Sequence, residues 1–246
     1  MGELVVERRF RGPPDSGNGG YVAGLVANAF APGTPVEVTL RLPPPLDRPM
    51  TLDAEDGRAV LHEGATVVAE GVAVARVDLE VPSPVSYADA LAAERRSYVL
   101  EHRERHPFPG CFVCGYERGD GDGLRIFVGP VDGRRVAAAA WCPDPSLAGP
   151  DGSVRPEFVW AALDCSGGIG SIYVDGNGVA RELPTYVLGR LTARVVASPD
   201  AGDECVVTGW RIGASGRKLD AGSAVHRADG TLLASARATW IALRES

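Results

Sequence analysis

The strongest hydrophobic pattern in the chain runs from Pro156 to Gly168 and has the period of an α-helix. Its apolar face is formed by Phe158, Ala161, Ala162 and Cys165. Proline suits the first turn of a helix, which does not need its missing N–H, and the acidic Glu157 complements the positive end of the helix dipole. The pattern therefore predicts a mostly apolar helix over 156–168.

One carboxylate, Asp164, interrupts this apolar helix. A buried carboxylate is costly unless it is paired, exposed to water or used in chemistry. One interpretation is that Asp164 lies on a solvated edge or caps a neighbouring element. The other is a functional role, because acids in unusual surroundings are common at active sites. The helix by itself leaves both interpretations open.

The first third of the chain predicts a strand, a helix and then several antiparallel strands. A loop rich in glycine and proline over 12–20 precedes an apolar stripe of helical period over 21–30. Residues 36–42 alternate strictly between apolar and polar, which is typical of a half-buried strand. Further strand patterns lie at 3–10, 50–53 with 58–62, and 66–80.

The rest of the chain returns to strands after a charged segment over 87–106, which we expect to be a surface helix connecting two halves. Asp132-Gly133 is a hairpin signal between strand patterns over 123–128 and 134–141. Beyond the apolar helix, strand patterns separated by turn residues lie at 186–197, 204–215, 218–227 and 232–243.

The second half of the chain repeats the first. The run Gly57-Arg-Ala-Val corresponds to Gly216-Arg-Lys-Leu, and residues 69–76 correspond to residues 234–241. A repeat of this length implies two copies of one α+β unit, each too small to bury its helix well alone. The expected divisions are an N-terminal unit over 1–81, a helical connector over 82–106 and a C-terminal unit over 107–246.

Composition narrows the class of protein. Hydrophobic residues make up 45% of the 246 residues, an ordinary value for a globular protein with a core. The net charge of −7 argues against nucleic acid or an anionic membrane as partner. The 5 cysteines are odd in number, which fits free thiols in a reducing compartment. No apolar run reaches membrane-spanning length, so we expect a cytoplasmic protein.

Three short motifs resemble the hotdog-fold thioesterase superfamily in its fused, double-hotdog form, and the resemblance covers nearly the whole chain. They are Gly19-Gly-Tyr-Val-Ala-Gly-Leu25, then Cys111-Phe-Val-Cys-Gly115 with Gly123-Leu-Arg-Ile126, and Ala162-Leu-Asp164; the last two are similar to the phenylacetate-type branch. The resemblance implies two long helices, each wrapped by an antiparallel sheet, with the sheets joined into one. It also implies that acyl-CoA or a similar pantetheine thioester binds between the units.

In that family a helix carboxylate acts as base or nucleophile on the thioester, and a backbone N–H at the start of the opposing helix polarises the carbonyl. Asp164 matches the carboxylate. Asn18-Gly19-Gly20 matches the family's His-Gly-Gly, with Asn in place of His, and glycine lets the thioester approach the backbone. The resemblance thus implies Asp164, Gly19, Gly20 and Asn18 as catalytic residues, although Asn18 also suits a plain helix N-cap.

The two halves are not equivalent at these positions. When Gly20-Tyr21 is set against Glu157-Phe158, Asp164 falls opposite Ala27, so the first half has no carboxylate there. The second half has Arg155-Pro156-Glu157 in place of the glycines. Each half keeps one component, which predicts one composite site per chain. Four neighbouring residues are candidates for substrate binding: Tyr21, Glu157, Ser166 and Thr185.

A second constellation has the ligand types of a compact zinc site: His102 and His106, followed by Cys111 and Cys114. Pro107 and Pro109 separate the two pairs, and the family has no zinc at these histidines. The alternatives are that the two cysteines are packed core residues or a redox-sensitive pair. The helical period assigns Cys165 to the core.

Two classes of function remain from the sequence. The first is hydrolysis of an acyl-CoA or acyl-carrier thioester at the composite site, chemistry that needs no cofactor. The second is a non-catalytic protein of the same fold that binds acyl-CoA or lipid. A carbonyl-sized gap between Asp164 and the amides of residues 19–21 would favour the enzyme. Fused hotdog proteins also pair through sheet edges or faces, so a homo-oligomer is possible.

Overall fold

A computed structural model describes residues 2–171 and 185–244. Its helices are Gly19–Ala27 (α1), Tyr87–Glu94 (α2), Tyr98–Glu101 (α3) and Pro156–Gly170 (α4), with 3₁₀ turns at Arg8–Phe10, Arg103–Arg105 and Pro145–Leu147. Its strands are Gly2–Val5 (β1), Val36–Leu40 (β2), Pro49–Glu55 (β3), Arg58–Glu63 (β4), Thr66–Ala73 (β5), Gly129–Pro130 (β6), Ala137–Trp141 (β7), Tyr186–Val195 (β8), Cys205–Ser215 (β9), Lys218–Arg227 (β10) and Leu232–Ala242 (β11).

The strands form one antiparallel sheet in the order β1-β3-β4-β5-β2-β8-β11-β10-β9-β7-β6. Strands β2 and β8 join the two halves, and their register sets Val38 opposite Leu191. On either side of this junction the strands follow the same order, β2-β5-β4-β3 in one half and β8-β11-β10-β9 in the other. The expected α+β architecture, with two sheets joined into one, is confirmed.

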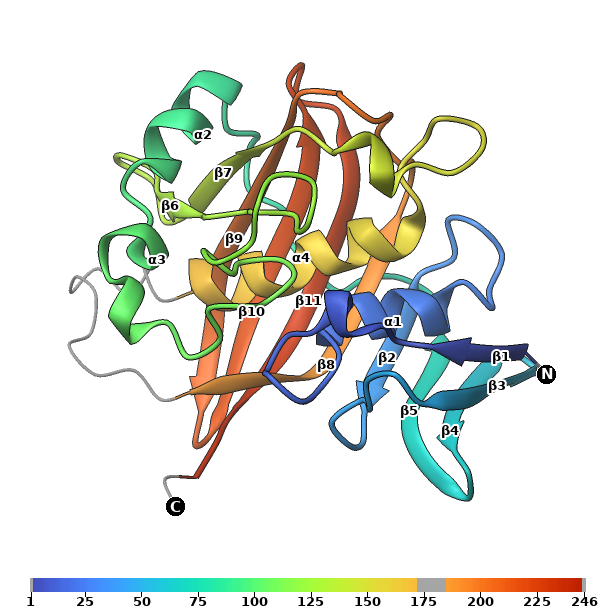
Figure 1. The fold of residues 1–246 in the computed structure, drawn as a ribbon. Coiled ribbons are helices and arrows are strands. Elements are labelled where there is room, and N and C mark those ends of the chain that lie inside the picture. The colour runs from blue at the N-terminus through green and yellow to red at the C-terminus, as the bar shows by residue number, and fades with distance from the viewer. Residues whose placement is uncertain (1, 172–184, 245–246) are drawn as a thin grey trace.

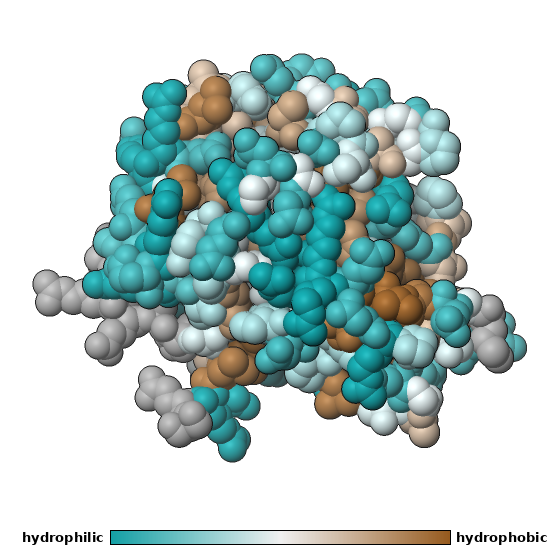
Figure 2. Space-filling view, in the orientation of Figure 1, coloured by the Kyte–Doolittle hydropathy of each residue, from teal (hydrophilic) through white to brown (hydrophobic). Residues whose placement is uncertain are grey.

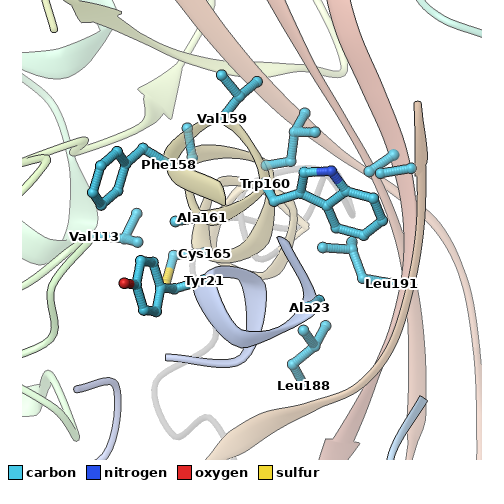
Figure 3. Close-up of a cluster of buried hydrophobic side chains, with 14 of the residues drawn as sticks. Tyr21, Ala23, Val113, Phe158, Val159, Trp160, Ala161, Cys165, Leu188 and Leu191 are labelled. Atoms are coloured by element: carbon cyan, nitrogen blue, oxygen red, sulfur yellow. The ribbon is translucent and has the colours of Figure 1, made fainter. Parts of the chain in front are cut away.

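The helices α1 and α4 lie together against the sheet, and α4 crosses the long strands β8 to β11 (Figure 1). Helix α4 is buried on nearly all sides because α1 covers one face and the sheet another. Figure 3 shows Trp160 and Leu191 on the sheet side of α4, with Phe158 and Tyr21 on the opposite side. The resemblance implies two long helices, but α1 has 9 residues and α4 has 15.

Two local predictions were wrong, and a third, the strand over 3–10, was right only in its first part. Residues 3–10 form the short β1 and then a 3₁₀ turn. Residues 87–106 are not one helix, because the chain breaks at the buried Ser97 between α2 and α3. Residues 123–128 are not a strand of the sheet. They run beside the cysteine loop, where the N–H groups of Leu124 and Ile126 donate to the carbonyls of Phe112 and Val113.

The surface seen in Figure 2 is mainly hydrophilic, with apolar residues in separate patches. None of the helices in the described part of the chain has the length and apolar character that a membrane span requires.

Candidate functional site

The Asp164 carboxylate lies between α4 and the start of α1. Its Oδ2 accepts hydrogen bonds from the backbone N–H of Gly20 at 2.8 Å and from Nδ2 of Asn18 at 3.1 Å. Its Oδ1 is buried and has no partner among the described residues. Asp164 is only 2% exposed, so the solvated-edge interpretation is wrong, but its bond to the Gly20 N–H does cap the first turn of the neighbouring helix α1. The carboxylate has one oxygen fixed by two hydrogen bonds and one buried oxygen without a partner among the described residues.

The close approach of the two helices depends on Gly20. A Cβ at this position would lie 2.4 Å from Cβ of Asp164 and 2.7 Å from the carbonyl oxygen of Trp160. Asn18 precedes the helix as its N-cap, and its Oδ1 accepts a hydrogen bond from the N–H of Tyr21 at 2.9 Å. Its side chain therefore caps α1 and also donates to the carboxylate. The cap interpretation and the contact with Asp164 hold together.

Burial raises the pKa of Asp164 to about 7, because the charged carboxylate loses its hydration. The hydrogen bonds from Gly20 and Asn18 oppose this shift, since they stabilise the charged form, while the neighbouring Cys111 adds to it. Among the N–H groups at the start of α1, those of Gly20 and Tyr21 are bonded to side chains. The first one, of Gly19, has no partner within the helix.

Asp164 opens onto a cavity of about 1080 Å³. Asn18 and Gly19 also line this cavity, and its apolar wall includes Leu40, Leu188 and Trp240. Such a mixture of apolar walls and a few converging polar groups is typical of small-molecule sites. The structure therefore brings Asp164, Asn18 and Gly19 together on one wall, and Gly20 stands directly behind the carboxylate.

Three thiols lie beside the carboxylate and line the same cavity: those of Cys111, Cys114 and Cys165. The pKa of Cys111 lies well below its usual value, because the thiols of Cys114 and Cys165 donate to its sulfur and the N–H groups of Cys114 and Val113 do so too. The pKa values of Cys114 and Cys165 are raised by the same contacts and by burial.

The expected zinc ligands do not gather as the spacing indicated. Within the described ranges, the ligand atoms that cluster belong to Cys111, Cys114 and Cys165, without either histidine. Nδ1 of His106 accepts a hydrogen bond from the N–H of Phe108 at 3.0 Å, and burial lowers its pKa. The side chain of His102 is 38% exposed and lies 3.9 Å from Glu104.

The four residues suggested for substrate binding have different positions. Thr185 lines the cavity, whereas the other three are not among the described lining residues. Tyr21 stacks on Phe10 at 4.3 Å, and burial raises the pKa of its hydroxyl to about 12. The hydroxyl of Ser166 donates to the carbonyl of Ala162 in its own helix.

Glu157 lies at the opposite end of the contact between α1 and α4. It is buried, and its Oε2 accepts a hydrogen bond from Nδ2 of Asn28 at 3.0 Å, while Arg155 lies 3.4 Å from its Oε1. By the alignment of the halves, this is the place that corresponds to Asp164 and Gly20. Here an acid and an amide fill the space, away from the cavity.

Cys165 is the residue that sequence reasoning missed. Its Sγ lies 3.7 Å from Sγ of Cys111 and 3.7 Å from Nδ2 of Asn18. Figure 3 shows it projecting from α4 on the side where Tyr21 and Val113 lie. A cysteine next to the candidate carboxylate, in a chain that also carries a Cys-x-x-Cys pair, was the available signal.

Comparison with known proteins gives the fold. No family model matches the chain, and no curated protein matches it. A conserved protein of unknown function with a hot dog fold from Alicyclobacillus acidocaldarius has 12% identity, with 99% of this chain and 93% of that chain covered and a TM-score of 0.60. An acyl-CoA thioesterase II from Mycobacterium marinum has 12% identity, 99% and 93% coverage and a TM-score of 0.59.

A tesB protein from Mycobacterium avium subspecies paratuberculosis is similar at 13% identity, with 94% of this chain and 89% of that chain covered and a TM-score of 0.57. The two Mycobacterium proteins and the hot dog protein thus share the architecture along nearly the whole chain. Identities of this size establish the fold alone, and the chain has the double hotdog fold.

Proposed function

We propose that the protein hydrolyses a pantetheine thioester, such as an acyl-CoA, at one composite site per chain. The observation that carries the proposal is the carboxylate of Asp164. The start of α1 holds one of its oxygens, the other is buried without a partner among the described residues, and the residue lines a cavity of about 1080 Å³. A fixed carboxylate with one available oxygen is suited to act as a general base.

In the proposed reaction, Oδ1 of Asp164 accepts a proton from a water molecule as that water attacks the thioester carbonyl carbon. Negative charge develops on the carbonyl oxygen, and the Gly19 N–H at the positive end of α1 stabilises it. The C–S bond then breaks, the acid forms, and the departing thiolate takes up the proton from Asp164. Gly20, which the sequence assigned to the carbonyl, instead holds the base.

The cavity also supports a phosphorylated carrier. Arg41 and Arg105 line it with side chains that are 54% and 48% exposed, and they pair with Glu70 and Glu104 at the surface. Guanidinium groups bind phosphate well, and both CoA and carrier-protein pantetheine carry phosphate. The apolar wall of Leu40, Leu188 and Trp240 suits an acyl group. We therefore propose that the carrier phosphates bind near the arginines and the acyl chain against this wall.

One observation favours a second candidate, a protein that binds acyl-CoA without hydrolysing it. Gly20 donates directly to Asp164, so this N–H leaves no carbonyl-sized gap between the amide and the carboxylate. In that case the carboxylate serves to lock α1 to α4, and the cavity serves only to hold the ligand.

A panel of short, long and aromatic acyl-CoAs separates the two candidates. Release of free CoA is followed with a thiol reagent, and binding of a non-hydrolysable thioether analogue is followed by calorimetry. A hydrolase turns over at least one thioester and binds its analogue. Saturable binding of an analogue, with no turnover of any thioester above the uncatalysed rate, would replace hydrolysis by the binding function.

A further inference from the structure

We propose that Cys111, Cys114 and Cys165 bind a zinc ion at the wall of the cavity. Their Sγ atoms all lie within 4.8 Å of one another, and those of Cys111 and Cys165 are 3.7 Å apart. Zinc–thiolate bonds of about 2.3 Å in a tetrahedron place two sulfurs about 3.8 Å apart. The spacing of these two thiols is thus that of two ligands on one ion.

The loop that carries Cys111 and Cys114 is shaped to present two sulfurs in the same direction. Cys111 and Cys114 are both buried, and their Sγ atoms lie within 4.8 Å of each other. The turn closes with the N–H of Gly115 on the carbonyl of Cys111 at 2.9 Å. A Cβ on Gly115 would lie 2.4 Å from that carbonyl oxygen, so the turn requires glycine.

The third sulfur comes from a rigid element that is distant in the sequence. Cys165 lies on α4, 54 residues after Cys111, and its neighbour along the helix is Asp164. The loop itself is held by the residues beyond it, since the N–H of Leu124 donates to Phe112 at 2.8 Å and that of Ile126 to Val113 at 3.0 Å. The three thiols are therefore brought together by the fold rather than by one flexible segment.

A metal accounts for the group better than a disulfide or plain packing. A disulfide between Cys111 and Cys165 requires their sulfurs to close from 3.7 Å to about 2.05 Å and leaves Cys114 unused. If the cysteines were only packed core residues, three thiols would line a cavity that Asn18 and Asp164 also line, without a role there. An ion uses all three sulfurs, and a water molecule from the cavity supplies the fourth ligand.

Zinc is the metal that this donor set favours, because thiolates in tetrahedral geometry select it among the common divalent ions. The ion would tie the cysteine loop to α4 beside Asp164. This inference stands apart from the proposed hydrolysis, because metal content and thiol chemistry can be measured without any substrate.

The test is the metal content of the untagged full chain, purified after growth with added zinc. We expect about one zinc per chain in the wild type and in Cys142→Ser, and less than a fifth of that in Cys114→Ser and Cys165→Ser. Cys142 is the matched control, because it is exposed and its Sγ donates to the carbonyl of Gly202 at the surface. Wild-type protein without zinc, which also fails to take up zinc after reduction, would overturn the proposal.

Because a serine variant can fail to fold, a second measurement uses the wild type alone. After a chelator removes the metal under reducing conditions, added Co²⁺ should give the charge-transfer and visible bands of tetrahedral cobalt bound to thiolates. Three of the 5 cysteines should also react faster with a thiol reagent after the chelator than before it. Absence of the cobalt bands, or thiol reactivity that the chelator leaves unchanged, would contradict a three-thiolate site.

Discussion

The backbone N–H of Gly20 donates to Oδ2 of Asp164 across 2.8 Å, and this bond joins residues that are 144 positions apart in the sequence. It is a direct bond between the two halves of the double hotdog. The bond fixes one carboxylate oxygen, while the other is buried without a partner among the described residues. Stability and the proposed chemistry therefore depend on the same contact.

Gly20→Ala tests how closely the two helices must approach. The added methyl would lie 2.4 Å from Cβ of Asp164, so we expect the free energy of unfolding to fall by about 1–3 kcal/mol. Urea unfolding measures this change. Gly213→Ala is the control, because nothing lies within 4 Å of a Cβ there. Equal free energies of unfolding for the two variants would show that α1 and α4 can move apart to accommodate the methyl group without loss of stability.

Asn18→Ser separates capping from orientation of the carboxylate. Serine is also a good N-cap, but it lacks the amide that donates to Asp164 at 3.1 Å. Loss of a hydrogen bond to a charged group is worth about 1.5–3 kcal/mol, which corresponds to a roughly 10- to 100-fold fall in kcat/KM. Asn28→Ser, at the other end of α1, should leave kcat/KM within about threefold. An unchanged rate in Asn18→Ser would mean that the amide does not position the base.

The variant Glu157→Gln tests whether the start of α4 takes part in substrate binding. Its carboxylate contacts Asn28 and Arg155 away from the cavity. We expect the free energy of unfolding to fall by about 1–3 kcal/mol, since hydrogen bonds to a charged group are weakened, while KM stays within about threefold. A tenfold rise in KM without a loss of stability would assign Glu157 to the substrate instead.

The buried His226 predicts acid-sensitive stability. Burial lowers its pKa from the ordinary 6.5, and its Nδ1 has no partner in the described part of the chain. Below pH 6.5 the unfolded state therefore binds more protons than the folded state. The free energy of unfolding falls as the pH drops from 6.5 to the folded-state pKa of His226, by at most about 1.4 kcal/mol per pH unit. Urea unfolding at pH 7.5 and pH 5.5 should show a smaller drop for His226→Leu than for wild type. Equal drops would show that His226 does not contribute.

Much of the fold follows from the periodicity of the sequence. The strict alternation over 36–42 predicted β2, and the helical stripe with Pro156 at its start predicted α4. Residues 123–128 alternate like a strand but pair with the cysteine loop instead of the sheet. The local alternation of apolar and polar residues indicates that a segment is extended, but tertiary packing decides which segment it pairs with.

The sequence predicted which residues form the candidate site better than it predicted how they are arranged. The resemblance brought Asp164 and Asn18-Gly19-Gly20 together, and the structure has them in contact. The Gly20 N–H either bonds to the Asp164 carboxylate or leaves room for a substrate carbonyl between them. The distance between α1 and α4 decides which, and the sequence does not give that distance. Cys165 was missed for a related reason. Its helical face is evident, but the arrival of the Cys111 loop at that face is a tertiary event.

The measurement that most directly tests the proposed function is kcat/KM of Asp164→Asn for the best thioester of the panel. Asparagine keeps the size of the side chain and removes the base. We expect kcat/KM to fall by about 10²- to 10⁴-fold while the folded state remains intact by circular dichroism. The matched control on the same helix is Ser166→Ala, whose hydroxyl bonds to the helix backbone and should leave the rate unchanged. A rate in Asp164→Asn equal to that of wild type would contradict the proposed hydrolysis through this carboxylate.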